Sequence, residues 1–185
     1  MKKISAGLKT KDKRQSGFTL LELLVALAVT GFIISGVAVS IYQIMSMNSS
    51  STNRIYAITQ TQNVGYWVSR DAEMAQEIEI SIEENGFPLI MTWVEWSGVG
   101  HISVYSLSEE TGEVTRDHYI KPVGETEYVL NNSVMVANSI EFDAEKTDCY
   151  KEMDGRLILK VTATAGGFMA VSETRQYEII PRPSV

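Results

Sequence analysis

The sequence predicts an α+β protein: a long N-terminal helix packed on a mostly antiparallel β-sheet head. Three observations support this prediction. Residues 18–47 contain a single charged residue, Glu22, and are long enough for a membrane-length helix. Apolar residues continue at helical spacing to about Gln76. Beyond that point they alternate with polar residues, as they do in half-buried strands.

Length and charge limit what the chain can be. Its 185 residues fit one compact domain, or one domain with an attachment. A net charge of -7 and a pI near 4.9 argue against a nucleic-acid-binding surface. The charge is uneven: residues 1–17 hold six basic residues and one acid, or +5, which leaves -12 for the rest. The two parts are therefore expected to meet different surroundings.

The apolar segment 18–47 is expected to span a membrane as a helix. About 20 apolar residues suffice for this, and a buried core helix of a soluble protein would be shorter and show a polar face. The basic flank predicts that residues 1–17 stay cytoplasmic and that the head is extracytoplasmic. Gly31, Ser35 and Gly36 would permit close approach between neighbouring helices.

Residues 48–76 read as an amphipathic continuation of the same helix. The polar patch Asn48–Asn53 contains neither Pro nor Gly, so it is either helical or a short break between two helices. A single helix from about Phe18 to about Gln76 would be roughly 90 Å long. The apolar residues expected on its buried face are Ile55, Ile58, Val64, Val68, Ala72 and Ala75. Those expected on its polar face include Arg54, Gln62, Arg70, Asp71 and Glu73.

The head, residues 77–185, is expected to form about seven strands in one mostly antiparallel sheet. In the third strand, Ile102, Val104 and Leu107 are expected to face the core. The clearest alternation places Leu157, Leu159, Val161 and Ala163 on one face of the sixth strand. A hairpin loop is expected at residues 109–112. The predicted strands span residues 77–83, 89–96, 101–107, 113–121, 134–142, 156–164 and 171–180.

The junction between the basic arm and the apolar helix carries a specific motif. A secretory signal cut near Ala38–Ser40 is disfavoured, because the apolar stretch is too long and continues to Met47. At the other end, Gln15-Ser-Gly-Phe-Thr-Leu-Leu-Glu22 joins a basic leader, a glycine, a phenylalanine and a single acid in register. This arrangement resembles the class III signal of type IV pilins and type II secretion pseudopilins.

The resemblance implies processing and assembly. A prepilin peptidase, which is also an N-methyltransferase, would cut between Gly17 and Phe18, leave 168 residues and methylate the new N-terminus at Phe18. Other pilin or pseudopilin subunits, an inner-membrane assembly platform and membrane lipid would be the partners. In such a family Glu22 would pair with a neighbour's N-terminal amine during assembly. The chemistry fits, because an unpaired carboxylate in hydrocarbon is costly; the alternative is a hydrated Glu22 near the headgroups.

The chain departs from many major pilins in two ways. It has no proline between Phe18 and Gly86, and its single cysteine, Cys149, cannot close a C-terminal disulfide loop or build a Cys-cluster metal site. The long-stranded head is similar to those of minor pilins and pseudopilins of the J or W kind, which implies a low-copy subunit at or near the tip.

Candidate chemical sites in the head are weak. His101 and His118 lack metal-ligand spacing, and the acidic loop at 143–154 does not match a calcium-binding EF-hand. Tyr66, Trp67, Trp93 and Trp96 are expected to be core aromatics rather than a binding patch. No catalytic constellation, metal site or cofactor motif is present, so the chain is not expected to be an enzyme.

Two functions remain. The first is a prepilin-like subunit, processed at the inner membrane and assembled into a type IV pilus or a type II secretion pseudopilus as a minor component. The second is a single-pass membrane-anchored β-rich module that binds or senses a ligand, which would keep its leader. No nucleic-acid partner is expected, because the exported part is acidic.

Overall fold

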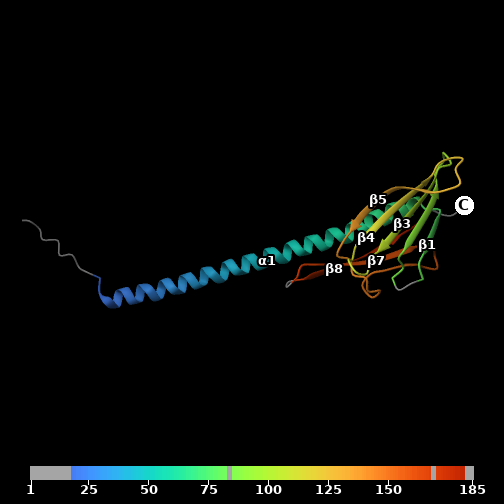
Figure 1. Cartoon of the computed structure of the whole chain (residues 1–185). Coiled ribbons are helices and arrows are strands. Elements are labelled where there is room, and N and C mark those ends of the chain that lie inside the picture. Colours follow the sequence, from blue (N-terminus) through green and yellow to red (C-terminus); the bar gives the residue numbers. More distant parts are fainter. Residues whose placement is uncertain (1–17, 83–84, 168–169, 182–185) are drawn as a thin grey trace, which may run out of the picture. The chain divides into compact units, whose positions relative to one another are not determined.

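The computed structural model describes residues 18–82, 85–167 and 170–181 (Figure 1). One helix, α1 (Leu20–Met74), is followed by eight strands in this described part of the chain. The α+β class predicted from the sequence is confirmed. The strands are β1 (Glu77–Ile80), β2 (Leu89–Val94), β3 (Gly100–Leu107), β4 (Val114–Lys121), β5 (Val129–Ala137), β6 (Asp148–Lys151), β7 (Leu157–Ala165) and β8 (Val171–Ile179).

The chain divides into two units, residues 1–45 and 46–185, and α1 belongs to both. The helix is continuous through Asn48–Asn53, so a break there is wrong. Within this polar patch the Thr52 hydroxyl donates to the Asn48 carbonyl oxygen at 2.9 Å, four residues earlier. Such a bond satisfies the hydroxyl without interrupting the helix.

In the second unit, α1 supplies the centre of the core. Val64, Val68 and Ala72 are fully buried, as their spacing predicts. Ile55, expected on the same face, is instead 66% exposed, and Asp71, expected on the polar face, is fully buried. The predicted buried stripe is therefore correct from residue 64 onward and wrong at its start. The helix residues that are buried are Ala57, Thr61, Val64, Gly65, Val68, Asp71 and Ala72.

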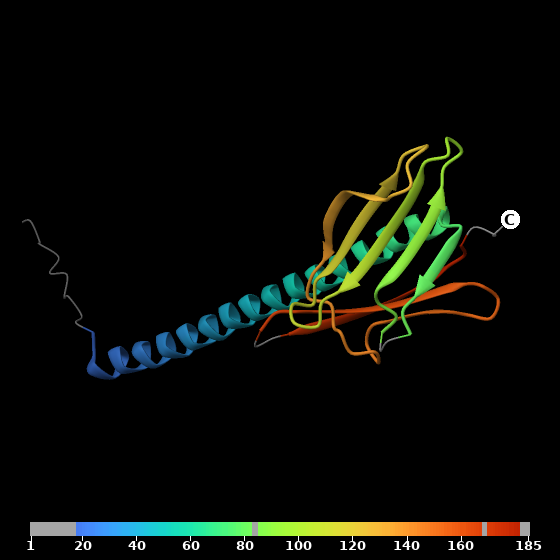
Figure 2. The same ribbon diagram turned by 45° about the vertical axis from the view of Figure 1, so that its right-hand side comes forward.

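The strands form two antiparallel sheets rather than the single sheet predicted. The larger has the order β1-β2-β3-β4-β5 and the smaller the order β6-β7-β8. In Figure 2 the green and yellow strands of the larger sheet lie across the second half of α1, and the smaller sheet runs beside it. The amphipathic helix is thus enclosed by two β layers, which buries more of its circumference than one sheet would.

Two strands differ from the prediction. The strand predicted at residues 134–142 is β5, which runs from Val129 to Ala137. It ends there because the chain turns at Ser139, which adopts a φ of 59°. Ile140 then forms an isolated bridge with Ala163 on the smaller sheet. The short strand β6 lies inside the stretch expected to be an acidic loop.

The inward face of β3 is opposite to the expected one. His101, Ser103 and Tyr105 are buried, whereas Ile102 and Val104 are only half-buried. Polar side chains can face a core when they have hydrogen-bond partners there, and β3 has such partners on α1 and β4. In β7 the prediction is confirmed, since Leu157, Leu159, Val161 and Ala163 are all fully buried.

Gly65 allows β8 to pack against the helix. A Cβ atom at Gly65 would lie 2.2 Å from Cζ of Tyr177, so the aromatic ring occupies the space that a side chain would need. The Tyr177 hydroxyl then donates to the Thr61 carbonyl oxygen at 3.1 Å. A glycine that costs about 1 kcal/mol in an isolated helix is therefore required here by packing.

Candidate functional site

The N-terminus of α1 is defined by its own residues. Thr19 caps the helix: its hydroxyl oxygen accepts the Glu22 backbone N–H at 3.3 Å, and its carbonyl accepts the Leu23 N–H at 3.2 Å. Thr-x-x-Glu is a capping-box pattern, so the helix start is encoded immediately after Phe18. Gly17 and the predicted leader, residues 1–17, lie outside the described residues.

Glu22 is an exposed carboxylate in the first turn of α1. In the described part of the chain its side chain forms no hydrogen bond or ion pair. A negative charge in this position is favoured by the partial positive charge of the helix N-terminus. The exposed position also leaves the Glu22 carboxylate available to a cation, such as an N-terminal amine, from the same or another chain.

The described part of the first unit, residues 18–45, presents a largely apolar surface. Its most apolar 18-residue window has a mean hydropathy of 2.4, and none of that window is buried in the structure. By length and composition α1 could therefore cross a membrane. Exposed apolar side chains on all sides need lipid or equally apolar neighbours, because water would not stabilise them.

Three hydroxyl side chains of this segment are satisfied within the helix itself. The hydroxyls of Thr30, Ser35 and Ser40 donate to backbone carbonyl oxygens three or four residues earlier, at 2.7, 2.8 and 2.9 Å. In hydrocarbon an unsatisfied hydroxyl would be costly, so this arrangement suits a lipid environment. Gly31 and Gly36 have open space where a Cβ would lie, and this leaves room for another helix.

The head contains a buried polar cluster that the sequence did not reveal. Asp71 on α1 accepts hydrogen bonds at 2.6 Å from both the Tyr105 hydroxyl and Arg116 Nε, and Arg116 Nη2 donates to Ser103 at 2.8 Å. Burial and the Asp71 charge raise the pKa of Tyr105. Burial alone would lower the pKa of Arg116, but its bond to Asp71 raises it. The cluster joins helix to sheet and is closed to solvent.

His101 and His118, which lack metal-ligand spacing in the sequence, lie side by side on β3 and β4. Their ring nitrogens are 3.2 Å apart, and Trp93 stacks against both rings. Burial, followed by the charges of Arg116 and His101, lowers the pKa of His118. In the described residues no group of three or more His, Cys, Asp or Glu side chains could hold a metal ion.

The single cysteine of the chain lies in the core. Cys149 on β6 is buried, and burial with the nearby Asp148 charge raises its thiol pKa to about 12, so the thiol is unreactive.

In the acidic stretch 143–154, Arg156 forms ion pairs with Glu152 and Asp154. The expectation of core aromatics holds for Trp93 and for half-buried Trp67, but Trp96 and Tyr66 are exposed.

One comparison with known proteins gives a result. The family described as the prokaryotic N-terminal methylation motif matches residues 12–38. This match covers Gly17, Phe18 and Glu22, and it supports a type IV pilin or pseudopilin-type prepilin that a prepilin peptidase processes. With the apolar helix, it suggests a membrane-anchored protein. Neither the curated proteins nor the solved structures include a match to the chain.

Proposed function

We propose that this prepilin-type chain is cut between Gly17 and Phe18, methylated at Phe18 and assembled into a type IV pilus or a type II secretion pseudopilus. In this proposal residues 1–17 remain cytoplasmic and the head, residues 77–185, lies outside the inner membrane. The protein acts by assembly and carries out no catalysis. The assembly platform in the inner membrane is its further partner.

The observation that carries the proposal is the methylation motif at residues 12–38, which includes the start of α1, a helix whose most apolar 18-residue window is not buried. Transfer of such an apolar helix from lipid into water is unfavourable. The helix can leave lipid only for an equally apolar environment, and a bundle of like helices provides one.

We assign Glu22 the role of register partner in assembly. Its carboxylate lies one turn from Phe18 and has no partner in the described part of the chain. A filament that buries this segment would leave the carboxylate costly unless it met a cation. The N-terminal amine of an adjacent processed subunit is a cation at a matching depth.

We place the subunit among the minor components, at or near the tip. Cys149 is a free and buried thiol, so it closes no C-terminal loop, and α1 runs without a proline through its apolar half. The head is large, with two sheets around the helix. These features differ from those of many abundant shaft subunits and favour the J or W kind.

The processing step is tested by expressing the full chain with and without a prepilin peptidase and measuring the intact mass and N-terminus of the membrane-bound protein. The expected product begins at Phe18 and carries one added methyl group. Gly17→Ala should block the cut, whereas Ser16→Ala should not. An uncut Met1 would favour a membrane-anchored ligand-binding protein, and a start near Ile41 would indicate an ordinary secretory signal; either result rejects the proposal.

The minor role is tested separately by counting this subunit against the most abundant subunit in purified filaments. A low-copy component should be present at a few per filament, and its deletion should reduce filament initiation rather than filament length. A copy number close to that of the shaft subunit would contradict the assignment while leaving the processing proposal intact.

A further inference from the structure

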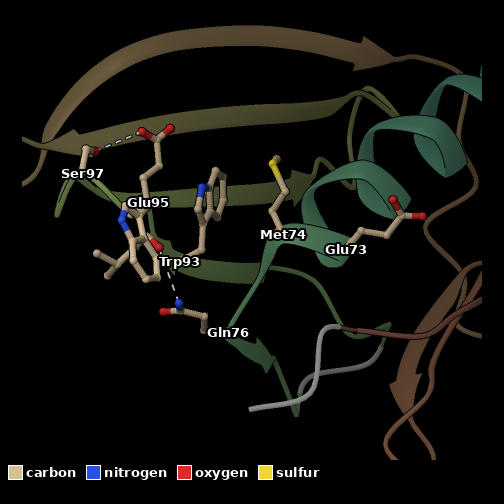
Figure 3. Close-up of a pocket in the computed structure, with 8 residues that line it drawn as sticks. Glu73, Met74, Gln76, Trp93, Glu95 and Ser97 are labelled. Carbon is tan, nitrogen blue, oxygen red and sulfur yellow. Dashed lines mark hydrogen bonds between the residues drawn. The ribbon is translucent and has the colours of Figure 1, made fainter. Parts of the chain in front are cut away.

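An open groove lies where α1 ends and β2 passes into β3. It has a volume of about 910 Å³. Figure 3 shows Glu73 and Met74 on the last turn of α1, with Trp93, Glu95 and Ser97 on β2 and the connection that follows it. The complete lining is Glu73, Met74, Gln76, Trp93, Val94, Glu95, Trp96 and Ser97.

Trp96 is held exposed on an ordered turn. Backbone hydrogen bonds of 2.9 Å, from the Glu95 N–H to Val99 and from the Gly98 N–H to Glu95, close the connection between β2 and β3. Trp96 is nevertheless 106% exposed. A fully exposed indole on a rigid turn forgoes a large burial energy, and such residues are enriched at the centres of binding surfaces.

The groove is electronegative and lacks a cation of its own. In the described residues Glu73 forms no hydrogen bond or ion pair, and the last turn of α1 holds no basic residue. The partial negative charge of the helix C-terminus is therefore uncompensated there. Glu95 faces only neutral or titratable groups, with its oxygens 3.3 Å from the Ser97 hydroxyl and 3.2 Å from His101 Nε2.

Arg70, three residues before Glu73, is engaged elsewhere. The Arg70 guanidinium carbon lies 4.7 Å from the centre of the Trp67 ring, and Arg70 Nε lies 3.9 Å from the buried Asp71 carboxylate. Arg70 is therefore held toward Trp67 and Asp71, neither of which lines the groove.

We propose that this groove docks an extended basic segment of a different protein. One lysine or arginine side chain of the segment would place its charged end beside Glu95 and another beside Glu73, with their aliphatic stems over Trp96 and Met74. Cations bind favourably over indole faces and beside carboxylates. A second copy of this chain is disfavoured as the occupant, because residues 46–185 contain 21 acidic and 10 basic residues and would repel one another. The inference concerns the head and does not depend on processing of the N-terminus.

The test uses the full chain in neutral detergent micelles and a fluorescent Gly-Ser peptide that carries three lysines at alternate positions. Saturable binding that weakens as salt increases is expected. Glu73→Gln or Glu95→Gln should each weaken it about threefold to fivefold, the contribution of an exposed charge pair. Trp96→Ala should weaken it by a similar factor. Each variant should retain a melting temperature close to that of the wild type, since all three side chains are exposed and Glu95→Gln keeps an oxygen acceptor beside Ser97 and His101.

Two controls make the result specific. Glu79→Gln removes an exposed carboxylate on β1 outside the groove and should leave peptide binding unchanged. The double variant Glu73→Lys/Glu95→Lys should lose the lysine peptide and gain binding to the same peptide with glutamates in place of lysines.

Three outcomes would overturn the proposal. Equal binding of a peptide with glutamines in place of lysines would show that charge is not recognised. An equal effect of Glu79→Gln would show that the whole acidic surface, rather than the groove, attracts the peptide. Trp96-dependent binding of cellohexaose without binding of the lysine peptide would reassign the groove to a neutral sugar.

Discussion

Arg116 Nε on β4 donates a hydrogen bond to Asp71 Oδ2 on α1 at 2.6 Å, and both side chains are buried. The same carboxylate oxygen accepts the Tyr105 hydroxyl from β3. The helix is therefore held to two central strands of the larger sheet through one atom. A displacement of α1 along its axis would leave a buried charge unpaired, so this ion pair selects one position of the helix on the sheet.

The first prediction concerns this pair. Asp71→Ala should lower the free energy of unfolding of the head by about 3–5 kcal/mol, because it leaves Arg116 buried without a counterion. Urea unfolding of the full chain in micelles, followed by tryptophan fluorescence, measures this. Trp67 reports directly, since its ring lies 5.2 Å from the Arg116 guanidinium carbon.

Arg54→Gln is the matched control, because Arg54 also joins α1 to the sheets, through a 3.7 Å contact with Glu173, but is exposed. It should change the free energy of unfolding by less than about 1 kcal/mol. Equal effects of Asp71→Ala and Arg54→Gln on the free energy of unfolding would mean that the buried Asp71–Arg116 pair stabilises the head no more than an exposed pair does.

The second prediction concerns Gly65. In an exposed helix, Gly→Ala would stabilise by about 1 kcal/mol, but here Gly65→Ala should destabilise by about 1–3 kcal/mol, because the methyl group meets the Tyr177 ring. In a Tyr177→Ala background the same change should be neutral or stabilising. A double-mutant cycle measures the coupling; additive effects of the two substitutions would contradict the packing argument.

The third prediction separates two roles of Glu22. Glu22→Gln keeps the helix cap, since the Glu22 backbone N–H still donates to Thr19, but removes the charge. If the charge pairs with a neighbour, Glu22→Gln should abolish filament assembly while leaving the cut after Gly17 intact. Thr19→Ala removes the cap, costs about 1 kcal/mol of helix stability and should reduce assembly much less. Filament yield and the mass of the N-terminus are the measurements. A larger loss of assembly in Thr19→Ala than in Glu22→Gln would show that Glu22 matters for the helix cap and not for its charge.

The fourth prediction is a pH dependence of head stability. The folded pKa of His118 lies below its ordinary 6.5, so the unfolded chain binds this proton more readily. The free energy of unfolding should therefore fall as pH drops below 6.5, and the His118 contribution should be absent above that pH. His118→Gln should flatten the profile between pH 7.5 and 5.5, measured by urea unfolding. An unchanged slope would show that His118 titrates alike in both states.

The fifth prediction concerns the thiol of Cys149. With its pKa raised to about 12 by burial, the folded protein should react with a disulfide reagent at pH 8 far more slowly than the unfolded chain. Absorbance of the released thiolate, with and without urea, measures both rates. Rapid stoichiometric labelling of the folded protein would contradict the buried position of Cys149.

The features that sequence patterns predict here are local ones. The apolar run after Phe18, the buried stripe of Val64, Val68 and Ala72, and the alternation in β7 each arise from short-range periodicity. The methylation motif is likewise contiguous, so its residues can be recognised before any fold is known.

The features that were missed depend on contacts between distant residues. Asp71 is buried where it meets Arg116, 45 residues away, and the buried Tyr105 and Ser103 of β3 form hydrogen bonds with the same two side chains. Hydropathy assigns such polar residues to the surface unless their partners are known. The groove beside Trp96 also depends on residues distant in sequence, since Glu73 lies on α1 and Glu95 follows β2.

The packing of Tyr177 over Gly65 joins the first element of the fold to the last. Until β8 has been synthesised, the Gly65 face of α1 lacks the Tyr177 ring that packs on it, although the larger sheet can already cover the Asp71 face. Contacts this far apart in sequence form late and slowly. A chain truncated before β8 would expose the Gly65 face of α1 and be more open to proteolysis, so closing the core requires the last described strand of the chain.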